Sequence, residues 1–187
     1  MIGSVSLPAG FCVARVEIEN GCGPHGDRHG CGRAAARRAL EELGEDPARL
    51  TYDGSRPLIR GGGAAISITH NRAVALAIAA RVGRLGIDRC DDDPRLPGLA
   101  VRFLVDERSL IERAEMIDTV HPLRSLAACF AAKEAALKAL GLGLVDGGVL
   151  DGTAIRVVSL DPPRLSQPEL QLALGRLDRS ALAVVYA

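Results

Sequence analysis

Two oppositely charged side chains that could act together lie in residues 130–141, FAAKEAALKALG. The apolar residues there recur at helical spacing, which predicts an amphipathic helix with Lys133 inside its apolar stripe. Glu134 and Lys138 are four residues apart and flank the stripe together. The plain interpretation of this pair is a solvated salt bridge that contributes about 0.3 kcal/mol.

A second acid, Asp88, closes a predicted short strand directly after Gly86 and Ile87. A glycine lets another group approach the backbone closely. An acid at a strand end and an acid on a helix can share one hard divalent cation, and Mg²⁺ takes one or two carboxylates plus substrate phosphates. Asp88 and Glu134 are therefore candidate metal ligands. Lys138, one turn beyond Glu134, would meet a phosphate as a point charge.

Several basic side chains precede or end the hairpin predicted below, and an arginine fork is well shaped to hold phosphate. They are Arg28, Arg33, Arg37, Arg38, Arg56 and His70. The chain has 23 basic residues besides histidine, and only Lys133 and Lys138 are lysines. For any one of so many arginines the simpler interpretation is a surface position, and for a lone histidine it is a structural role.

A third candidate is a metal site near the N-terminus, where Cys22, His25, His29 and Cys31 lie within ten residues. These ligand types suit zinc, but zinc sites usually separate two close ligand pairs by about a dozen or more residues. A glycine-rich loop is therefore the favoured interpretation. The alternative is a small arginine-rich domain with a structural zinc.

The elements that would position these residues follow from hydrophobic periodicity and turn signals. Strands are expected at residues 12–18, 65–70, 74–78, 85–88, 153–160 and 181–186, and helices at 32–44, 97–116 and 123–140. Residues 21–32 are predicted to form a loop and 54–63 a turn, while 65–70 and the next strand form a hairpin around Asn71–Arg72. Strands precede and follow the helices without regular βαβ alternation, which predicts an α+β fold.

Composition narrows the class of protein further. The 187 residues suffice for one large or two small domains, and 48% apolar with 25% charged residues is ordinary globular composition. The net charge of zero argues against a nucleic-acid-binding protein. No apolar run is long enough for a membrane helix, and the first residues lack the pattern of a secretory signal. We therefore expect a cytoplasmic protein whose five cysteines are reduced.

Taken together, these motifs resemble those of the 4′-phosphopantetheinyl transferases, in particular the siderophore- and surfactin-synthetase type. Gly86-Ile87-Asp88, followed after about forty residues by the Lys-Glu-x-x-x-Lys segment 130–138, is similar to the paired signature of that family. Arg102-Phe103 with Glu107 is similar to the short helix between the two motifs. Upstream, residues 32–37, Arg56-Pro57 and residues 67–70 are similar to the segments that precede the first motif.

The resemblance implies an activity. The enzyme would transfer 4′-phosphopantetheine from coenzyme A to a serine of an apo acyl or peptidyl carrier protein, with Mg²⁺, and release adenosine 3′,5′-bisphosphate. This holo-acyl-carrier-protein synthase activity would serve polyketide, nonribosomal peptide or siderophore biosynthesis. The alternative is a catalytically impaired homologue that still binds carrier proteins.

The resemblance also implies residue roles. Asp88 and Glu134 would hold Mg²⁺ against the pyrophosphate, Lys138 would contact that pyrophosphate, and Glu134 would take the serine proton directly or through water. The nucleotide end with its 3′-phosphate would be held by Arg28, Arg56, Thr69 and His70. The family usually has a second acid two residues after the first, and this chain has Cys90 there. A water would then complete the magnesium shell.

Finally, the resemblance implies a monomer built as a pseudo-dimer of two similar α+β halves. The expected halves are residues 1–83, with the coenzyme A nucleotide contacts, and 84–187, with the magnesium ligands and the Lys-Glu-x-x-x-Lys motif. Coenzyme A would bind in the cleft between them. The expected partners are coenzyme A and a carrier protein, with no nucleic acid and no membrane.

Overall fold

The computed structural model describes residues 3–18, 28–92, 96, 98, 103–117, 123–142 and 155–187. The elements up to residue 80 are β1 (Phe11–Glu17), α1 (Arg28–Leu43), a 3₁₀ turn (Pro47–Arg49), β2 (Leu50–Asp53), β3 (Arg56–Ile59), β4 (Ala65–His70) and β5 (Val74–Ala80). The later elements are β6 (Leu85–Asp91), α3 (Arg108–Ile117), α4 (Leu123–Leu140), β7 (Val157–Leu160), β8 (Pro163–Leu165), β9 (Gln171–Leu177) and β10 (Ser180–Tyr186). The fold is mixed α+β, as the sequence predicts.

Two three-stranded antiparallel sheets form the centre of the molecule. Their strand orders are β1-β5-β4 and β6-β10-β9, and each sheet is accompanied by a two-stranded hairpin, β2-β3 or β7-β8. In each sheet the first strand forms one edge. Helix and hairpin follow along the chain, the next strand forms the opposite edge, and the last strand lies between the two edges. The two parts of the chain thus share the same order of strands, with α3 as an additional helix in the second part.

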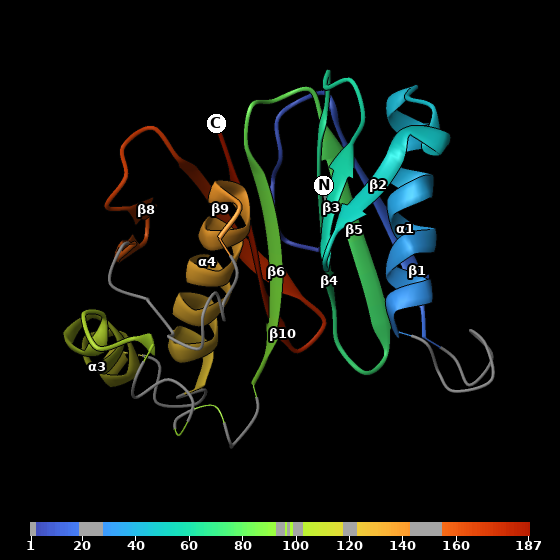
Figure 1. Ribbon diagram of the computed structural model, residues 1–187. Coiled ribbons are helices and arrows are strands. Elements are labelled where there is room, and N and C mark those ends of the chain that lie inside the picture. The colour runs from blue at the N-terminus through green and yellow to red at the C-terminus, as the bar shows by residue number, and fades with distance from the viewer. Residues whose placement is uncertain are drawn as a thin grey trace.

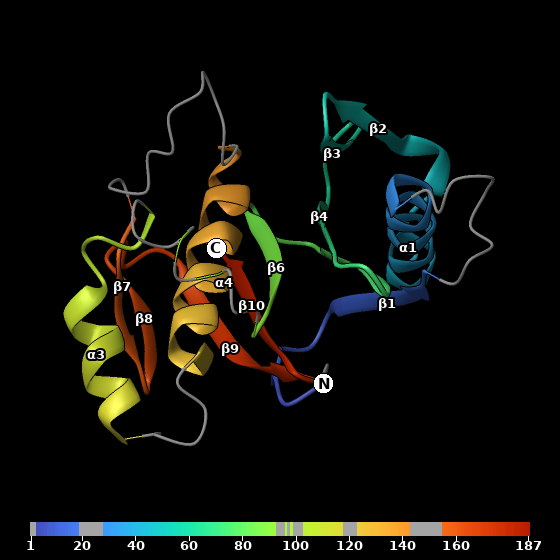
Figure 2. The ribbon, with the colours of Figure 1, turned by 90° about the horizontal axis from the view of Figure 1, so that it is seen from below.

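The layers can be followed in Figures 1 and 2, which show α1 outside the first sheet and α4 outside the second. Alternation along β5 explains this arrangement, because successive strand residues point to opposite faces. Ala77 and Ala79 pack under α1, where small side chains let the helix lie close. Leu76 and Ile78 point the other way and pack against Ile87 of the second sheet. All seven residues of β5 are consequently buried.

The structure confirms the hairpin and the long helix predicted from the sequence. β4 pairs with β5 in the register His70↔Ala75, and α4 spans the predicted residues 123–140. Residues 56–59 were expected in a turn but form β3, because they pair with β2. β8 and β9 were not predicted, and α1 begins four residues before the predicted start, at Arg28.

The predicted helix over 97–116 is only partly described. Its later part is α3, whereas residues 105–107 form a turn. Arg102 lies outside the described residues, as do the first residues of the strand expected at 153–160, which starts at Val157. No helix in the described part of the chain is long and apolar enough to cross a membrane.

Candidate functional site

A close approach of α4 to β6 brings the two predicted motifs together. A Cβ atom on Gly86 would lie only 1.8 Å from the carbonyl oxygen of Ala135, so only glycine fits there. Asp88 is two residues further along the strand and therefore points to the same face, toward α4. Glu134 and Lys138 lie on α4 beside it.

Asp88 is the centre of a buried polar group, with an exposed fraction of 3%. The Nζ of Lys138 donates to its Oδ1 at 2.7 Å, and the hydroxyl of Thr69 donates to the same oxygen at 3.0 Å. Lys138 also donates to the carbonyl oxygen of Ile87 at 3.1 Å. The other carboxylate oxygen, Oδ2 of Asp88, is buried and accepts from no N–H or hydroxyl group among the described residues, while the carboxyl group of Glu134 lies within hydrogen-bonding reach of Asp88.

Glu134 completes this group, and its ionised form is unfavourable there. Burial, together with the negative charge of Asp88, raises the pKa of Glu134 to about 8, although Lys138 opposes the shift. Burial lowers the pKa of Lys138, but Asp88 and Glu134 outweigh this effect and raise it. Two carboxyl groups with one ammonium group thus share a desolvated space, and the pair of acids is short of positive charge.

These residues fit a magnesium ion. The buried Oδ2 of Asp88 and the carboxyl group of Glu134 are hard oxygen donors, which Mg²⁺ prefers. Among the described residues, no three His, Cys, Asp or Glu side chains gather in a way that could hold a metal by themselves. A site with two carboxylates would leave the other coordination positions of Mg²⁺ to water and substrate oxygens.

Hydroxyl groups of β4 join the two sheets next to this group. The Oγ of Ser67 accepts from the backbone N–H of Ile87 at 3.0 Å, and Thr69 Oγ1 accepts from that of Arg89 at 3.3 Å. Both β4 and β6 are edge strands of their sheets, so side chains satisfy backbone groups that no strand pairs. Ser67 and Thr69 are buried for this reason.

A pocket of about 630 Å³ opens between the two sheets at this seam. The side chain of Arg33 stacks over the ring of Tyr52 at 5.1 Å, and His29 meets His70 edge-on at 5.7 Å between ring centroids. The lining residues come from α1, the β2–β3 hairpin, β4, β6 and α4: His29, Gly32, Arg33, Tyr52, Gly54, Ser55, Ile68, Thr69, His70, Asp88, Arg89, Glu134 and Lys138.

The structure brings together five of the seven residues predicted for the site, since Thr69, His70, Asp88, Glu134 and Lys138 all line this pocket. The other two do not appear in its lining. Arg56 lies instead beside the glycine that follows α4, where a Cβ on Gly141 would be 2.4 Å from its Nη1. The side chain of Arg28 lies outside the described residues.

The residues of the proposed zinc cluster do not all lie in the described part. Cys22 and His25 fall outside it. Cys31 is buried in α1, and His29 faces His70 in the pocket. The zinc alternative therefore stays a hypothesis about residues 22–31.

Three pocket residues were missed by the sequence analysis: Tyr52, Gly54 and Ser55. All belong to the β2–β3 hairpin, which was not predicted. A signal was present, because Leu-Thr-Tyr-Asp is rich in strand-forming residues and precedes a Gly-Ser turn. Arg89 was not predicted either, because it follows the Gly86-Ile87-Asp88 motif and is not part of it.

Cys90 shares the face of β6 on which Asp88 lies, and it is buried against α4. Burial, and then the charge of Asp88, raise the pKa of this thiol far above its ordinary value. The thiol therefore stays neutral at physiological pH and adds no negative charge to the pair of acids.

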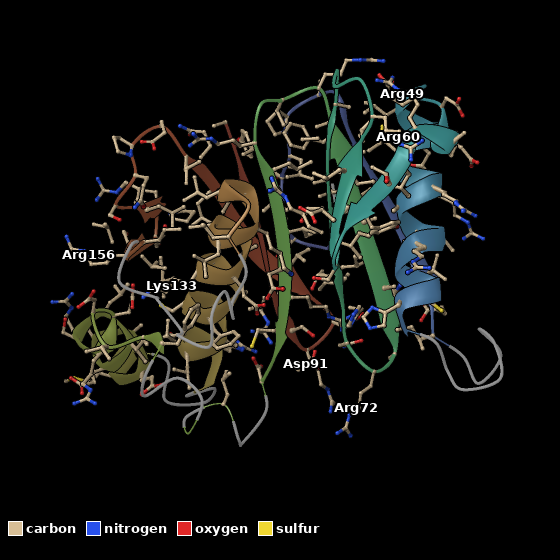
Figure 3. All side chains as sticks on the ribbon, viewed as in Figure 1. Arg49, Arg60, Arg72, Asp91, Lys133 and Arg156 are labelled. Atoms are coloured by element: carbon tan, nitrogen blue, oxygen red, sulfur yellow. The ribbon has the colours of Figure 1, made fainter. Side chains whose placement is uncertain are left out.

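Lys133 is not in the lining of the pocket and lies on the side of α4 toward α3 (Figure 3). Its Nζ donates to the carbonyl oxygen of Phe103 at 2.8 Å and to Glu107 Oε2 at 2.9 Å. The other oxygen of Glu107 accepts from the backbone N–H of Val157 at 3.0 Å. This buried ion pair ties α4 to the segment before α3 and to β7.

Comparison with known proteins provides independent evidence on the family. Residues 29–80, which include α1, the β2–β3 hairpin, β4 and β5, match the family model of the 4′-phosphopantetheinyl transferase N-terminal domain. A search of curated proteins found no match. The matched segment contains His29, Tyr52 and His70, which form one wall of the pocket.

Proposed function

Because the match over residues 29–80 supports membership of the 4′-phosphopantetheinyl transferase superfamily, we propose that this protein is a transferase of that kind. In this proposal it moves 4′-phosphopantetheine from coenzyme A to a serine of an apo acyl or peptidyl carrier protein. The reaction requires Mg²⁺ and belongs to the biosynthesis of polyketides, nonribosomal peptides or siderophores in the cytoplasm.

One observation carries the proposal, namely the charge pattern of the pocket between the sheets. Asp88 and Glu134 lie close together in the lining, and Lys138, Arg33 and Arg89 contribute three positive charges. A pyrophosphate with a divalent cation is complementary to such a set, because the acids bind the cation and the basic groups bind the phosphate oxygens.

Each residue then has a role in the transfer. A bound Mg²⁺ would supply charge stabilisation of the pyrophosphate at Asp88 and Glu134. Lys138, whose Nζ lies 2.7 Å from Asp88 Oδ1, would contact the same pyrophosphate as a point charge. Glu134 accepts the proton of the carrier serine, directly or through water. The serine oxygen forms a bond to the phosphorus of phosphopantetheine, and adenosine 3′,5′-bisphosphate leaves with the electrons of the broken P–O bond.

The nucleotide end of coenzyme A, including its 3′-phosphate, is proposed to be held by Arg28, Arg56 and His70, with Thr69 beside them. Arg56 would have to turn away from Gly141 to take this role. His29 and Tyr52, which line the same wall, extend the contact surface beyond the residues that the sequence indicated.

We also propose that the molecule is a monomer of two equivalent halves, residues 1–83 and 84–187, with coenzyme A between them. The identical strand order of the two central sheets supports this division. So does the position of the pocket, to which both sheets contribute residues.

A second candidate function is binding of carrier proteins without efficient transfer. The buried, neutral Cys90 favours it, because it occupies the position of a family acid and weakens the negative field that would hold Mg²⁺.

The test is incubation of the protein with coenzyme A, Mg²⁺ and a panel of apo acyl and peptidyl carriers, followed by intact mass measurement of each carrier. We expect one carrier to gain one phosphopantetheine and the Glu134→Gln variant to leave it unmodified. Binding of carriers without any mass gain, in wild type and in Cys90→Glu, would favour the second function. A protein that leaves every carrier unmodified and binds none of them would overturn both functions.

A further inference from the structure

Arg89 is a buried cation in the wall of the pocket, and no sequence motif assigns it a role. Its side chain is only 6% exposed. The Nε donates to the hydroxyl of Ser180 at 2.8 Å, and Nη2 lies 3.6 Å from Asp178 Oδ2. Nη1 is shielded from water and has no hydrogen-bond acceptor among the described residues.

An unsatisfied nitrogen on a buried guanidinium group requires an explanation. A guanidinium group does not lose its proton in proteins, so the charge cannot be removed by titration. Leaving a buried donor on a charged group without a partner costs on the order of 1–3 kcal/mol or more. An anionic ligand in the pocket would supply the missing acceptor.

The orientation of Arg89 is set by a polar network at the end of β6. Ser180, which accepts from Arg89, donates in turn to Asp91, and the side-chain amide of Asn71 donates to Asp91 at 3.1 Å. Figure 3 shows Asp91 at this end of the strand, near the β4–β5 turn. The network thus connects both sheets and fixes the Nε edge of Arg89, which leaves the Nη1 edge for another partner.

The position of Arg89 indicates which end of a ligand it meets. The hydroxyl of Thr69 donates to Asp88 and accepts from the backbone N–H of Arg89, so Arg89 directly adjoins the two acids. Asp88 and Glu134 are the two acids in the lining of this pocket. We propose that Arg89 contacts the pyrophosphate of coenzyme A through Nη1 and is a further anion-binding residue of this site.

This inference rests on the proposed function and assigns Arg89 to one group of its substrate. The test is calorimetric titration of wild type and Arg89→Gln with coenzyme A and with dephospho-coenzyme A, which lacks the 3′-phosphate. We expect the variant to raise the Kd of both ligands by about 10- to 100-fold, the range for a lost hydrogen bond to a charged group. Because both ligands contain the pyrophosphate, the ratio of their Kd values should stay that of wild type.

Arg15→Gln is the matched control, because Arg15 reaches the same network through Asp178 at 3.8 Å but does not line the pocket. Its Kd values should equal those of wild type. If Arg89→Gln does not fold, Arg89→Lys keeps the charge but cannot hold Ser180 and a phosphate oxygen together. We expect its Kd values to rise as well.

The outcomes separate this inference from the function on which it rests. If wild type, Arg89→Gln and Arg89→Lys all bind coenzyme A with the same Kd, the inference is overturned and the proposed function is not. A loss of affinity for coenzyme A but not for dephospho-coenzyme A also overturns it, because Arg89 would then meet the 3′-phosphate. Wild type that binds neither ligand overturns the inference together with the proposed function.

Discussion

At the residue scale, Asp88 and Glu134 are two ordinary acids whose surroundings make them a candidate site. Each alone would be a solvated carboxylate, but β6 and α4 place them side by side in a desolvated space. Lys138 compensates only one charge of the two, and Asp88 Oδ2 accepts from no N–H or hydroxyl group among the described residues. The metal-free protein accommodates both acids by keeping a proton on Glu134, and Mg²⁺ would take the place of that proton, which is the physical basis for expecting Mg²⁺ to bind here.

Replacing Glu134 by glutamine tests this role directly. We expect Glu134→Gln to abolish transfer, since loss of a charge contact in such a site raises the barrier by about 3–4 kcal/mol, or on the order of 10²–10³ in rate. The melting temperature without metal should be unchanged or slightly higher, because the repulsion with Asp88 disappears. Carrier mass gain and a thermal melt of the same preparation measure both quantities. Full activity in this variant would remove Glu134 from the mechanism.

The raised pKa of Glu134 predicts a pH dependence of metal stabilisation. An acid with a pKa of about 8 in the folded protein and an ordinary value near 4.5 when unfolded holds its proton more tightly in the folded state. The stability of the metal-free protein should therefore fall as pH rises between these values. Because Mg²⁺ must displace that proton, its stabilising effect should be larger at pH 8.5 than at pH 6.5.

Thermal melts with Mg²⁺ and with a chelator, at the two pH values, check this prediction. Each kcal/mol of added stability corresponds to roughly 2–4 °C in a protein of this size. Glu134→Gln is the control, since its response to Mg²⁺ should be weak at both pH values. An equal response of wild type at the two pH values would contradict the assignment of Glu134 as a ligand.

The two lysines of α4 have different roles, and stability measurements can separate them. Lys133→Ala leaves Glu107 buried without its partner, which typically costs about 3–5 kcal/mol. Lys138 is 30% exposed, so Lys138→Ala should reduce turnover with a smaller loss of stability. Urea unfolding of both variants measures the difference. The double variant Lys133→Met/Glu107→Gln should recover much of the loss, and equal destabilisation of the two single variants would contradict this division.

At the scale of secondary-structure elements, the sequence predicts the helices and strands whose hydrophobic periodicity and turn residues lie within one short segment. Helix α4 and the β4–β5 hairpin follow from periodicity and turn residues, and the structure confirms both. The β2–β3 hairpin was missed because Gly54 and Pro57 read as turn residues, while pairing across four positions decided the outcome. Arg56 was assigned to the pocket from its motif alone. Its place beside Gly141 depends on tertiary packing that no local pattern reports.

The contact between β6 and α4 predicts a large effect of a small change. Gly86→Ala would place a Cβ 1.8 Å from a backbone oxygen of α4, so the helix has to move. We expect a loss of about 1–3 kcal/mol or more in unfolding free energy, and a loss of transfer activity because Glu134 moves relative to Asp88. Gly83→Ala is the matched control, since its Cβ would be 3.4 Å from the nearest atom. Similar denaturation curves for the two variants would show that this contact is not tight.

At the scale of the whole molecule, the two proposed halves share one core. Ile78 of the first sheet packs in the same buried cluster as Ile87 and Val184 of the second. The N-terminal segment also contacts the second sheet, because the backbone N–H of Ser4 donates to the carbonyl oxygen of Arg176 on β9 at 2.9 Å. The pocket lies at the seam of this shared core, so its shape depends on both sheets staying together.

The shared core predicts that neither half folds by itself. A fragment of residues 84–187 would expose the apolar face formed by Ile87, Leu182 and Val184, which β5 covers in the full chain. We expect this fragment to bind a hydrophobic dye and to melt without a cooperative transition, whereas the full chain unfolds in one step. Ile78→Ala in the full chain should lower stability by about 2–5 kcal/mol while keeping a single transition, because both sheets lose the same contact. A fragment that melts cooperatively, or a full chain that unfolds in two steps, would show that the halves are independent domains.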